Sequence, residues 1–199
     1  MKLLFILAVL IGCTTKLPIP IDKTAQLKTS AIESIQRIVI NNAGGHCSST
    51  FVEHNGKVRH ITNAHCCQNT VTYNDQVVDI VKKDNILDLC ELSHNNMPPI
   101  GLILKNEFRL FDDVVAVGFT YILSEDKKHL LGLRKRYSIG NIESIIMNNI
   151  VSSAPTYPGM SGGALLSDDG RLVGLTRATF TIDHSNISIP SFIIREFLN

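Results

Sequence analysis

The chain has 199 residues, 44% of them hydrophobic, which is enough to build the core of one domain or of two tightly joined lobes. Its 19 Lys and Arg residues nearly balance its 18 Asp and Glu residues, so the formal net charge is only +1. This balance argues against a nucleic-acid-binding role, which needs an excess of positive charge, and we expect no nucleic-acid partner.

The N-terminal segment has the pattern of an export signal. Met1 and Lys2 are followed by an apolar run from Leu3 to Ile11 that is too short to span a bilayer as a helix. The run ends in Leu10-Ile11-Gly12-Cys13, which resembles the bacterial lipobox, whose cysteine is lipidated and becomes the mature N-terminus. We therefore expect residues 1–13 to be a signal peptide and Cys13 to anchor an exported protein to the membrane, in the cell envelope, periplasm or cell surface. A plain signal peptide cleaved nearby, which would give a secreted protein, is the alternative.

Residues 14–29 predict a linker, because they are polar, contain Pro18 and Pro20, and show no apolar periodicity. The segment Ser30-Ala31-Ile32-Glu33 then has the spacing of a capping box, which predicts a short helix. We expect the folded domain to span residues 30–199.

Short apolar or β-branched runs separated by turn residues fill the following segment and predict strands. They are Ile38–Ile40, Ser49–Val52, Val58–Thr62, Val71–Tyr73 and Val77–Val81. Asn55-Gly56, between two of these runs, is a strong signal for a β-hairpin.

The second half continues in the same way, with runs at Ile100–Leu104, Val114–Phe119, Tyr137–Ile139, Ile142–Met147, Ala164–Leu166 and Leu172–Thr176. Asp168-Asp169-Gly170 predicts a turn, and Ser191, before an apolar stripe that ends at Leu198, predicts the N-cap of a closing helix. Regularly spaced strands without long helical periods indicate an all-β fold built of barrels.

A serine stands among glycines in the segment Gly159-Met160-Ser161-Gly162-Gly163. Glycine has no Cβ, so a substrate carbonyl can come close to the main-chain N–H groups of such a loop. If Ser161 is a nucleophile, the N–H groups of Gly159 and Ser161 are candidates for an oxyanion hole. A serine hydroxyl is a weak nucleophile alone, so a base and a group that orients the base are also required.

Histidine and carboxylate candidates stand upstream of this serine. His65, in Thr62-Asn63-Ala64-His65-Cys66, would be the general base, since imidazole accepts and returns a proton near neutral pH. Asp88 would orient it. Asp84 is the rival carboxylate, and we prefer Asp88 because the apolar Leu89 and Leu92 lie in the strand beside it.

These three motifs, in the order His, Asp, Ser, resemble the trypsin/chymotrypsin-like serine proteases, and the tail from Ser167 to Ser191 looks most like bacterial HtrA-type and related trypsin-like peptidases. The resemblance implies two six-stranded antiparallel barrels, at about residues 37–105 and 106–199, with a cleft between them. His65 and Asp88 would lie on the first barrel and Ser161 on the second. It further implies cleavage of polypeptide substrates through an acyl-enzyme, without a cofactor or metal. We expect no appended peptide-binding domain after the catalytic unit.

Met160 changes what the resemblance implies about activation. Trypsin-type zymogens have an Asp before the nucleophile, and that Asp pairs with a newly freed N-terminal amine. With Met160 in this place the ion pair cannot form, so we expect no activation by N-terminal insertion.

The sequence gives less information on which substrate side chain the primary specificity pocket would select. Pro155 stands where digestive trypsin has the Asp that selects Lys or Arg. Thr156 stands where glutamyl-specific and viral 3C-like proteases have a pocket hydroxyl, but Thr176 stands where those families have a histidine, so no Glu or Gln preference is assigned. We take Pro155, Thr156, Thr176, Arg177 and Ala178 as candidate substrate-binding residues, at a strand edge where a peptide would pair.

Besides Cys13, the chain has four cysteines, and in an exported protein an even number favours disulfides, with three possible pairings. The family resemblance implies a Cys47–Cys66 bridge, which leaves Cys67–Cys90, while Cys47–Cys67 remains possible. A zinc site built from His46 and the four cysteines is an alternative, although there is no close CxxC spacing. Free buried thiols are another, if the protein stays in a reducing compartment.

Two alternatives to a peptidase remain from the sequence. A protease-like domain without activity could serve as a binding or scaffold module, although the intact His65, Asp88 and Ser161 argue against it. A zinc-stabilised protein without catalysis is the other.

Overall fold

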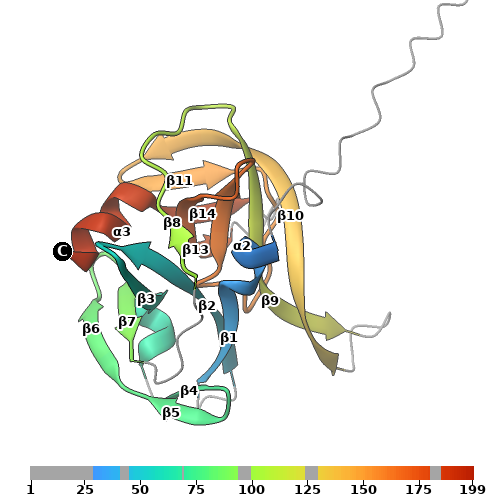
Figure 1. The fold of residues 1–199 in the computed structure, drawn as a ribbon. Helices are drawn as coiled ribbons and strands as arrows, with labels where there is room; N and C mark the ends of the chain where they lie inside the picture. The colour runs from blue at the N-terminus through green and yellow to red at the C-terminus, as the bar shows by residue number, and fades with distance from the viewer. Residues whose placement is uncertain (1–28, 41–44, 69, 94–99, 124–129, 180–184) are drawn as a thin grey trace, which may run out of the picture.

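The computed structural model describes residues 29–40, 45–68, 70–93, 100–123, 130–179 and 185–199 (Figure 1). The predicted signal peptide, Cys13 and nearly all of the predicted linker lie outside these ranges. The predicted fold class is confirmed, since strands dominate and short helices, α2 (Thr29–Glu33) and α3 (Ser191–Leu198), lie at the two ends of the described chain. In the described ranges, no helix has the length and apolar character needed to cross a membrane.

The first lobe is a sheet formed by the strands before residue 104. These are β1 (Ile35–Ile40), β2 (Gly45–His54), β3 (Lys57–Thr62), β4 (Val71–Tyr73), β5 (Gln76–Val78), β6 (Ile80–Asp84), β7 (Leu89–Leu92) and β8 (Leu102–Ile103). Seven follow the order β5-β4-β1-β2-β3-β7-β6, and β8 pairs in parallel with β2. The described sheet thus has eight strands, two more than the six expected of this lobe; β4 and β5 form a hairpin beside β1, and the short β8 joins β2. A 3-10 helix, η1 (Ala64–Cys67), follows β3.

The second lobe is a closed barrel of the expected six strands. They are β9 (Asp113–Leu123), β10 (Leu130–Ile146), β11 (Asn149–Ser152), β12 (Ala164–Ser167), β13 (Leu172–Thr179) and β14 (Asn186–Pro190). Their order around the barrel is β10-β11-β14-β13-β12-β9. The runs at Tyr137–Ile139 and Ile142–Met147, expected as two strands, largely belong to one long β10, and the far end of its hairpin with β9 projects from the barrel (Figure 1).

Two predicted turns are confirmed. Asn55 and Gly56 take φ values of 51° and 71° between β2 and β3, the left-handed conformation that a two-residue hairpin loop requires. Gly170, with φ of 78°, closes the turn between β12 and β13.

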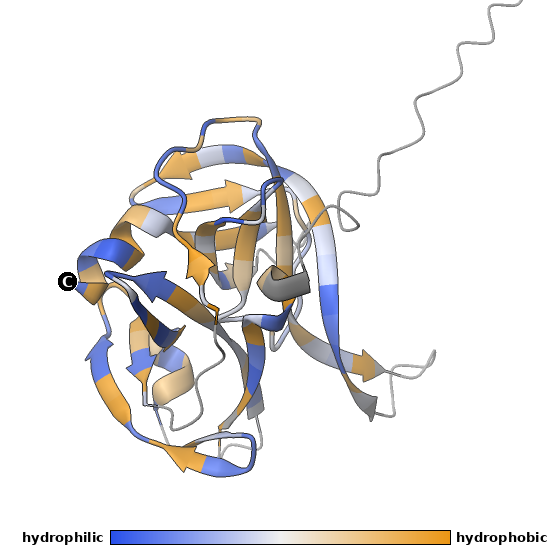
Figure 2. Cartoon of the chain, in the orientation of Figure 1, coloured by the Kyte–Doolittle hydropathy of each residue, from blue (hydrophilic) through white to orange (hydrophobic). Residues whose placement is uncertain are grey.

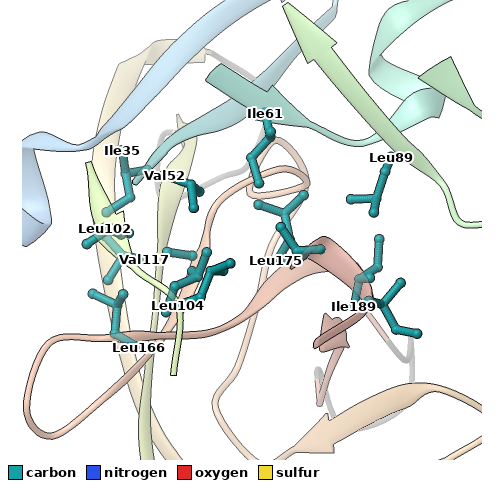
Figure 3. Close-up of a cluster of buried hydrophobic side chains, with 14 of the residues drawn as sticks. Ile35, Val52, Ile61, Leu89, Leu102, Leu104, Val117, Leu166, Leu175 and Ile189 are labelled. Carbon is teal, nitrogen blue, oxygen red and sulfur yellow. The ribbon is translucent and has the colours of Figure 1, made fainter. Parts of the chain in front are cut away.

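One hydrophobic cluster joins the two lobes (Figure 3). Ile61 and Leu89 from the first sheet meet Leu175 and Ile189 from the barrel, as the close-up shows. Figure 2 shows β8 and much of β9 in the orange of hydrophobic residues. The remaining members include buried residues of α3, namely Ile193, Ile194, Phe197 and Leu198. The lobes therefore share a core, and the C-terminal helix closes it.

The closing helix is capped differently from the prediction. Its N-cap residue is Pro190, whereas Ser191 is the first residue of the helix. The Ser191 hydroxyl donates to the carbonyl of Lys105 at 2.6 Å instead of capping the helix, so it ties α3 to the segment between the lobes.

Because the cluster belongs to both lobes, shortening one of its side chains should destabilise the whole chain. Leu166 on β12 is fully buried in it. We expect Leu166→Ala to lower the free energy of unfolding by about 2–5 kcal/mol, through lost burial and the cavity left behind, in a single urea-induced transition.

The matched control is Ile86→Ala, since the Ile86 side chain is 89% exposed. Its effect should stay within about 0.5 kcal/mol. Two separate transitions in the Leu166→Ala protein would contradict the shared core.

Candidate active site

His65 and Asp88 are held against each other at the edge of the first lobe. His65 Nδ1 lies 3.1 Å from Asp88 Oδ1 and 3.0 Å from Oδ2, and the backbone N–H of His65 donates to Oδ1 at 3.0 Å. A carboxylate accepts hydrogen bonds, so this contact assigns the imidazole proton to Nδ1 and leaves a lone pair on Nε2. The His65 side chain is 42% exposed, whereas that of Asp88 is 9% exposed. The pair can therefore act as an oriented base that faces solvent.

The backbone around Asp88 is fixed as firmly as its side chain. Asp88 takes a φ of 56°, a left-handed conformation that is unfavourable for most L-residues. Its carbonyl accepts hydrogen bonds from the Ala64 N–H at 3.0 Å and from Asn63 Nδ2 at 3.2 Å. Asp84, the rival carboxylate, instead accepts from the N–H groups of Ile86 and Leu87 in the turn before Asp88.

Ser161 is connected to this pair through Arg177. The Ser161 hydroxyl donates to the Arg177 carbonyl at 3.2 Å, and Arg177 Nε lies 3.2 Å from Asp88 Oδ2. Among the described residues, no hydrogen bond joins Ser161 to His65. The three predicted catalytic residues thus gather around Arg177, with the serine hydroxyl turned to a carbonyl.

The loop of Ser161 is anchored through its carbonyl groups. Ser48 on β2 donates from its N–H to the Ser161 carbonyl at 2.8 Å and from its hydroxyl to the Gly159 carbonyl at 2.9 Å. The hydroxyl of Thr50 donates to the Gly162 carbonyl at 2.9 Å. Within the described chain, the N–H groups of Gly159 and Ser161 donate to no other group. They remain available to an incoming oxygen.

Two positions in this loop require glycine. Gly159 has a φ of 95°, and a Cβ there would lie 2.1 Å from Nε2 of His46. Gly162 has a φ of 82°, and a Cβ there would lie 2.1 Å from the Ser48 carbonyl oxygen. A side chain at either position would push the loop away from the first lobe.

Burial and neighbouring groups change the pKa values of Asp88 and His46. Burial opposes ionisation of Asp88, yet the hydrogen bonds from His65 and the positive charge of Arg177 outweigh it, so the pKa of Asp88 is lowered. His46 is buried, packs edge-to-face on Tyr121 at 4.1 Å and has its pKa lowered by burial and by Arg37. At neutral pH the His46 imidazole beside Gly159 is therefore uncharged.

Two disulfides surround the histidine. Cys47 on β2 is bonded to Cys66, and Cys67 is bonded to Cys90 on β7. The first is the bridge that the family resemblance implies, and the second is the pair that it leaves. Sulfur atoms bonded in disulfides are not available as thiolate ligands, so the zinc site expected as an alternative is incompatible with this arrangement.

The candidate substrate-binding residues differ in their exposure to solvent. The side chains of Thr156 and Thr176 are buried, and Asn186 Nδ2 donates to Thr176 Oγ1 at 3.4 Å. Pro155 is partly exposed and Ala178 is exposed on β13. The Arg177 side chain points to Asp88 rather than away from the site.

Sequence reasoning missed the residues that hold the serine loop. Ser48 and Thr50 are fully buried, although hydroxyl residues are usually exposed. The run Ser48-Ser49-Thr50, next to Cys47, is the sequence feature that could have revealed them. Hydroxyl groups buried in a strand need hydrogen-bond partners, so such a run indicates contacts with another segment of the chain. Met160, which stands where trypsin-type zymogens have an Asp, is fully buried in the barrel core.

A family model of the trypsin-like peptidase domain matches residues 47–175. Among solved structures, the chain is similar to a serine endoprotease from Yersinia pestis, with a TM-score of 0.68 and 20% identity over 90% of this chain. A protease from M. tuberculosis in its active form gives a TM-score of 0.68 with 17% identity over 89%, and an HtrA-type protease with a tripeptide gives 0.67 with 18% over 88%. The aligned regions cover 66%, 82% and 61% of those chains, so this chain spans less than two thirds of the first and the third. No curated protein sequence matches the chain.

Acid should weaken the fold through Asp88. Its pKa is lower in the folded protein than the value of about 3.9 in an unfolded chain, so the carboxylate stabilises the fold above that pH, and this contribution is lost as the pH falls through the folded-state pKa. We expect the free energy of unfolding in urea to fall less in Asp88→Asn than in the unaltered protein between about pH 5.5 and about 2.5.

Asp169, whose pKa is also lowered, is present in both proteins and leaves some acid sensitivity in each. Asp79→Asn, which alters an exposed carboxyl without an ion pair in the described structure, should behave like the unaltered chain. Equal acid sensitivity of Asp88→Asn and the unaltered protein would show that the Asp88 carboxylate does not stabilise the fold.

Proposed function

Because the chain belongs to the trypsin-like peptidase domain family, we propose that it is a serine endopeptidase in which His65, Asp88 and Ser161 form the catalytic triad. The observation that carries the proposal is that the oriented His65–Asp88 pair is linked through Arg177 to a serine loop whose Gly159 and Ser161 N–H groups have no partner in the described chain. A base, a nucleophile and two oxyanion donors are the groups that acyl transfer needs.

In the first half of the reaction, the Ser161 oxygen attacks the carbonyl carbon of the scissile peptide bond. His65 Nε2 takes the hydroxyl proton as the new C–O bond forms, and the negative oxygen is stabilised by the N–H groups of Gly159 and Ser161. The C–N bond then breaks, and the leaving amine takes the proton from His65. The product is an acyl-enzyme on Ser161.

In the second half, water repeats the attack on the acyl carbon. His65 accepts a proton from the water, the C–O bond to Ser161 breaks, and the proton returns to the Ser161 oxygen. The buried Asp88 carboxylate keeps the proton of the imidazole on Nδ1 in both halves and stabilises the imidazolium that forms.

The Ser161 hydroxyl must break one hydrogen bond before it reacts. In the resting site it donates to the carbonyl of Arg177. Rotation about the Cα–Cβ bond of Ser161 frees the hydroxyl from this carbonyl, and staggered rotamers of a partly exposed serine interconvert rapidly.

A fluorophosphonate probe tests this function, because it labels only an activated serine. The unaltered protein should be labelled at Ser161, Ser161→Ala should not be labelled, and His65→Ala should react slower by about three orders of magnitude or more, since the base is lost. Labelled residues are identified by mass spectrometry of the digested protein.

Ser144→Ala, at a partly exposed serine on β10, is the matched control and should be labelled normally. Absence of labelling in the folded, unaltered protein, with no cleavage of a peptide library, would overturn the proposal. That result would favour the inactive binding module.

We also propose that the protein is exported and anchored to the membrane through a lipid on Cys13. The support is the sequence pattern Leu10-Ile11-Gly12-Cys13 after a short apolar run.

In a bacterial host, the full chain should incorporate a labelled fatty acid and sediment with membranes. Cys13→Ala should lose the label and leave the membrane fraction. Incorporation of the label by Cys13→Ala, or its absence from the full chain, would contradict the anchor.

A further inference from the structure

Arg177 contacts two members of the proposed triad at once. Its Nε lies 3.2 Å from Asp88 Oδ2, the same oxygen that lies 3.0 Å from His65 Nδ1. Its carbonyl accepts the hydroxyl proton of Ser161 at 3.2 Å. The side chain is 37% exposed, so the guanidinium stands at the boundary between the buried carboxylate and solvent.

A β-bulge turns Arg177 toward this site. On β13, Thr176 pairs with Ser188 and Ala178 pairs with the adjacent Ile187, so Arg177 has no partner in the register. Such an extra residue bends its strand and redirects its own side chain. Arg177 Nη1 also donates to Asn149 Oδ1 at 3.4 Å, a second contact of the guanidinium.

We propose that Arg177 is a positioning residue of the peptidase reaction, whose guanidinium holds the Asp88 carboxylate in the orientation that receives the Nδ1–H of His65. The proposal rests on the proposed function, because it assigns the pair its catalytic use. Arg177 does not touch the reacting atoms through its side chain and acts through Asp88.

The hydrogen bonds of the carboxylate explain why a further donor is needed. Oδ1 accepts from the backbone N–H and from Nδ1 of His65, whereas Oδ2 shares Nδ1 and otherwise has only Arg177 among the described residues. Without Arg177, one oxygen of a buried carboxylate would lack a donor of its own, and the carboxylate could rotate to find one. The flat, always charged guanidinium is suited to fix the plane of a carboxylate, and an ammonium group fixes it less well.

The test compares Arg177→Gln with Arg177→Lys. For a peptide substrate, Arg177→Gln should lower kcat by about ten- to a hundredfold and leave KM nearly unchanged, because a misplaced base weakens the chemical step and not binding. Arg177→Lys should recover part of the loss, since it keeps the charge. Arg134→Gln, an exposed arginine on β10, is the matched control and should keep the original kcat.

A second measurement does not need activity. In a Ser161→Ala background, the proton on His65 Nδ1 should give a low-field NMR resonance, assigned by its absence in His65→Gln. The added Arg177→Gln change should shift or broaden this resonance, while circular dichroism verifies the fold.

These results separate the possible roles. A rise in KM with kcat unchanged would make Arg177 a substrate contact and overturn the proposal, as would an unchanged kcat together with an unchanged resonance. If the unaltered protein cleaves nothing, the proposed function fails, and the resonance still decides whether Arg177 positions the pair.

Discussion

The serine loop depends on hydrogen bonds that come from the other lobe. Ser48 and Thr50 of β2 bind the carbonyl groups of Gly159, Ser161 and Gly162. These bonds fix the loop in the conformation in which the N–H groups of Gly159 and Ser161, the proposed oxyanion donors, have no partner in the described chain. The geometry proposed for catalysis on the second lobe therefore exists only when the first lobe is folded and docked, and the shared hydrophobic cluster provides that docking.

The strand β2 also sets the position of the base. Cys47, next to Ser48, is bonded to Cys66 beside His65, so one strand fixes both the histidine helix and the serine loop. The neighbouring Cys67 bonds to Cys90, two residues after Asp88. The adjacent Cys66 and Cys67 thus tie the short 3-10 helix to β2 and to β7. A helix of four residues has little stability of its own, and these covalent links limit how far His65 can move from Asp88.

The sequence predicted the fold class and most of the strands, and it offered candidates for the site. Apolar runs and turn residues located most strands, because a half-buried strand alternates and a hairpin turn needs residues such as Asn55 and Gly56 that accept positive φ. The strands β11 and β14 were missed. Each is short and contains buried polar residues, Ser152 in β11 and Asn186 and Ser188 in β14, so neither contains a long apolar run that would have marked a strand. The chemistry of His65, Asp88 and Ser161 was recognisable from residue type, whereas the long-range contacts between the lobes have no local pattern.

Arg177 was noticed for its place in the chain, but its contacts with Asp88 and Ser161 could not be predicted from the sequence. Its position along β13 suggested the edge of a substrate site, which treats the strand as regular. A bulge at this point removes Arg177 from the pairing register and turns its side chain to Asp88. The bulge also leaves the Arg177 carbonyl outside the register, where it accepts the Ser161 hydroxyl. One irregular residue thereby binds the Ser161 hydroxyl with its backbone and the Asp88 carboxylate with its side chain, so the two contacts that the proposed mechanism uses are coupled through the same residue.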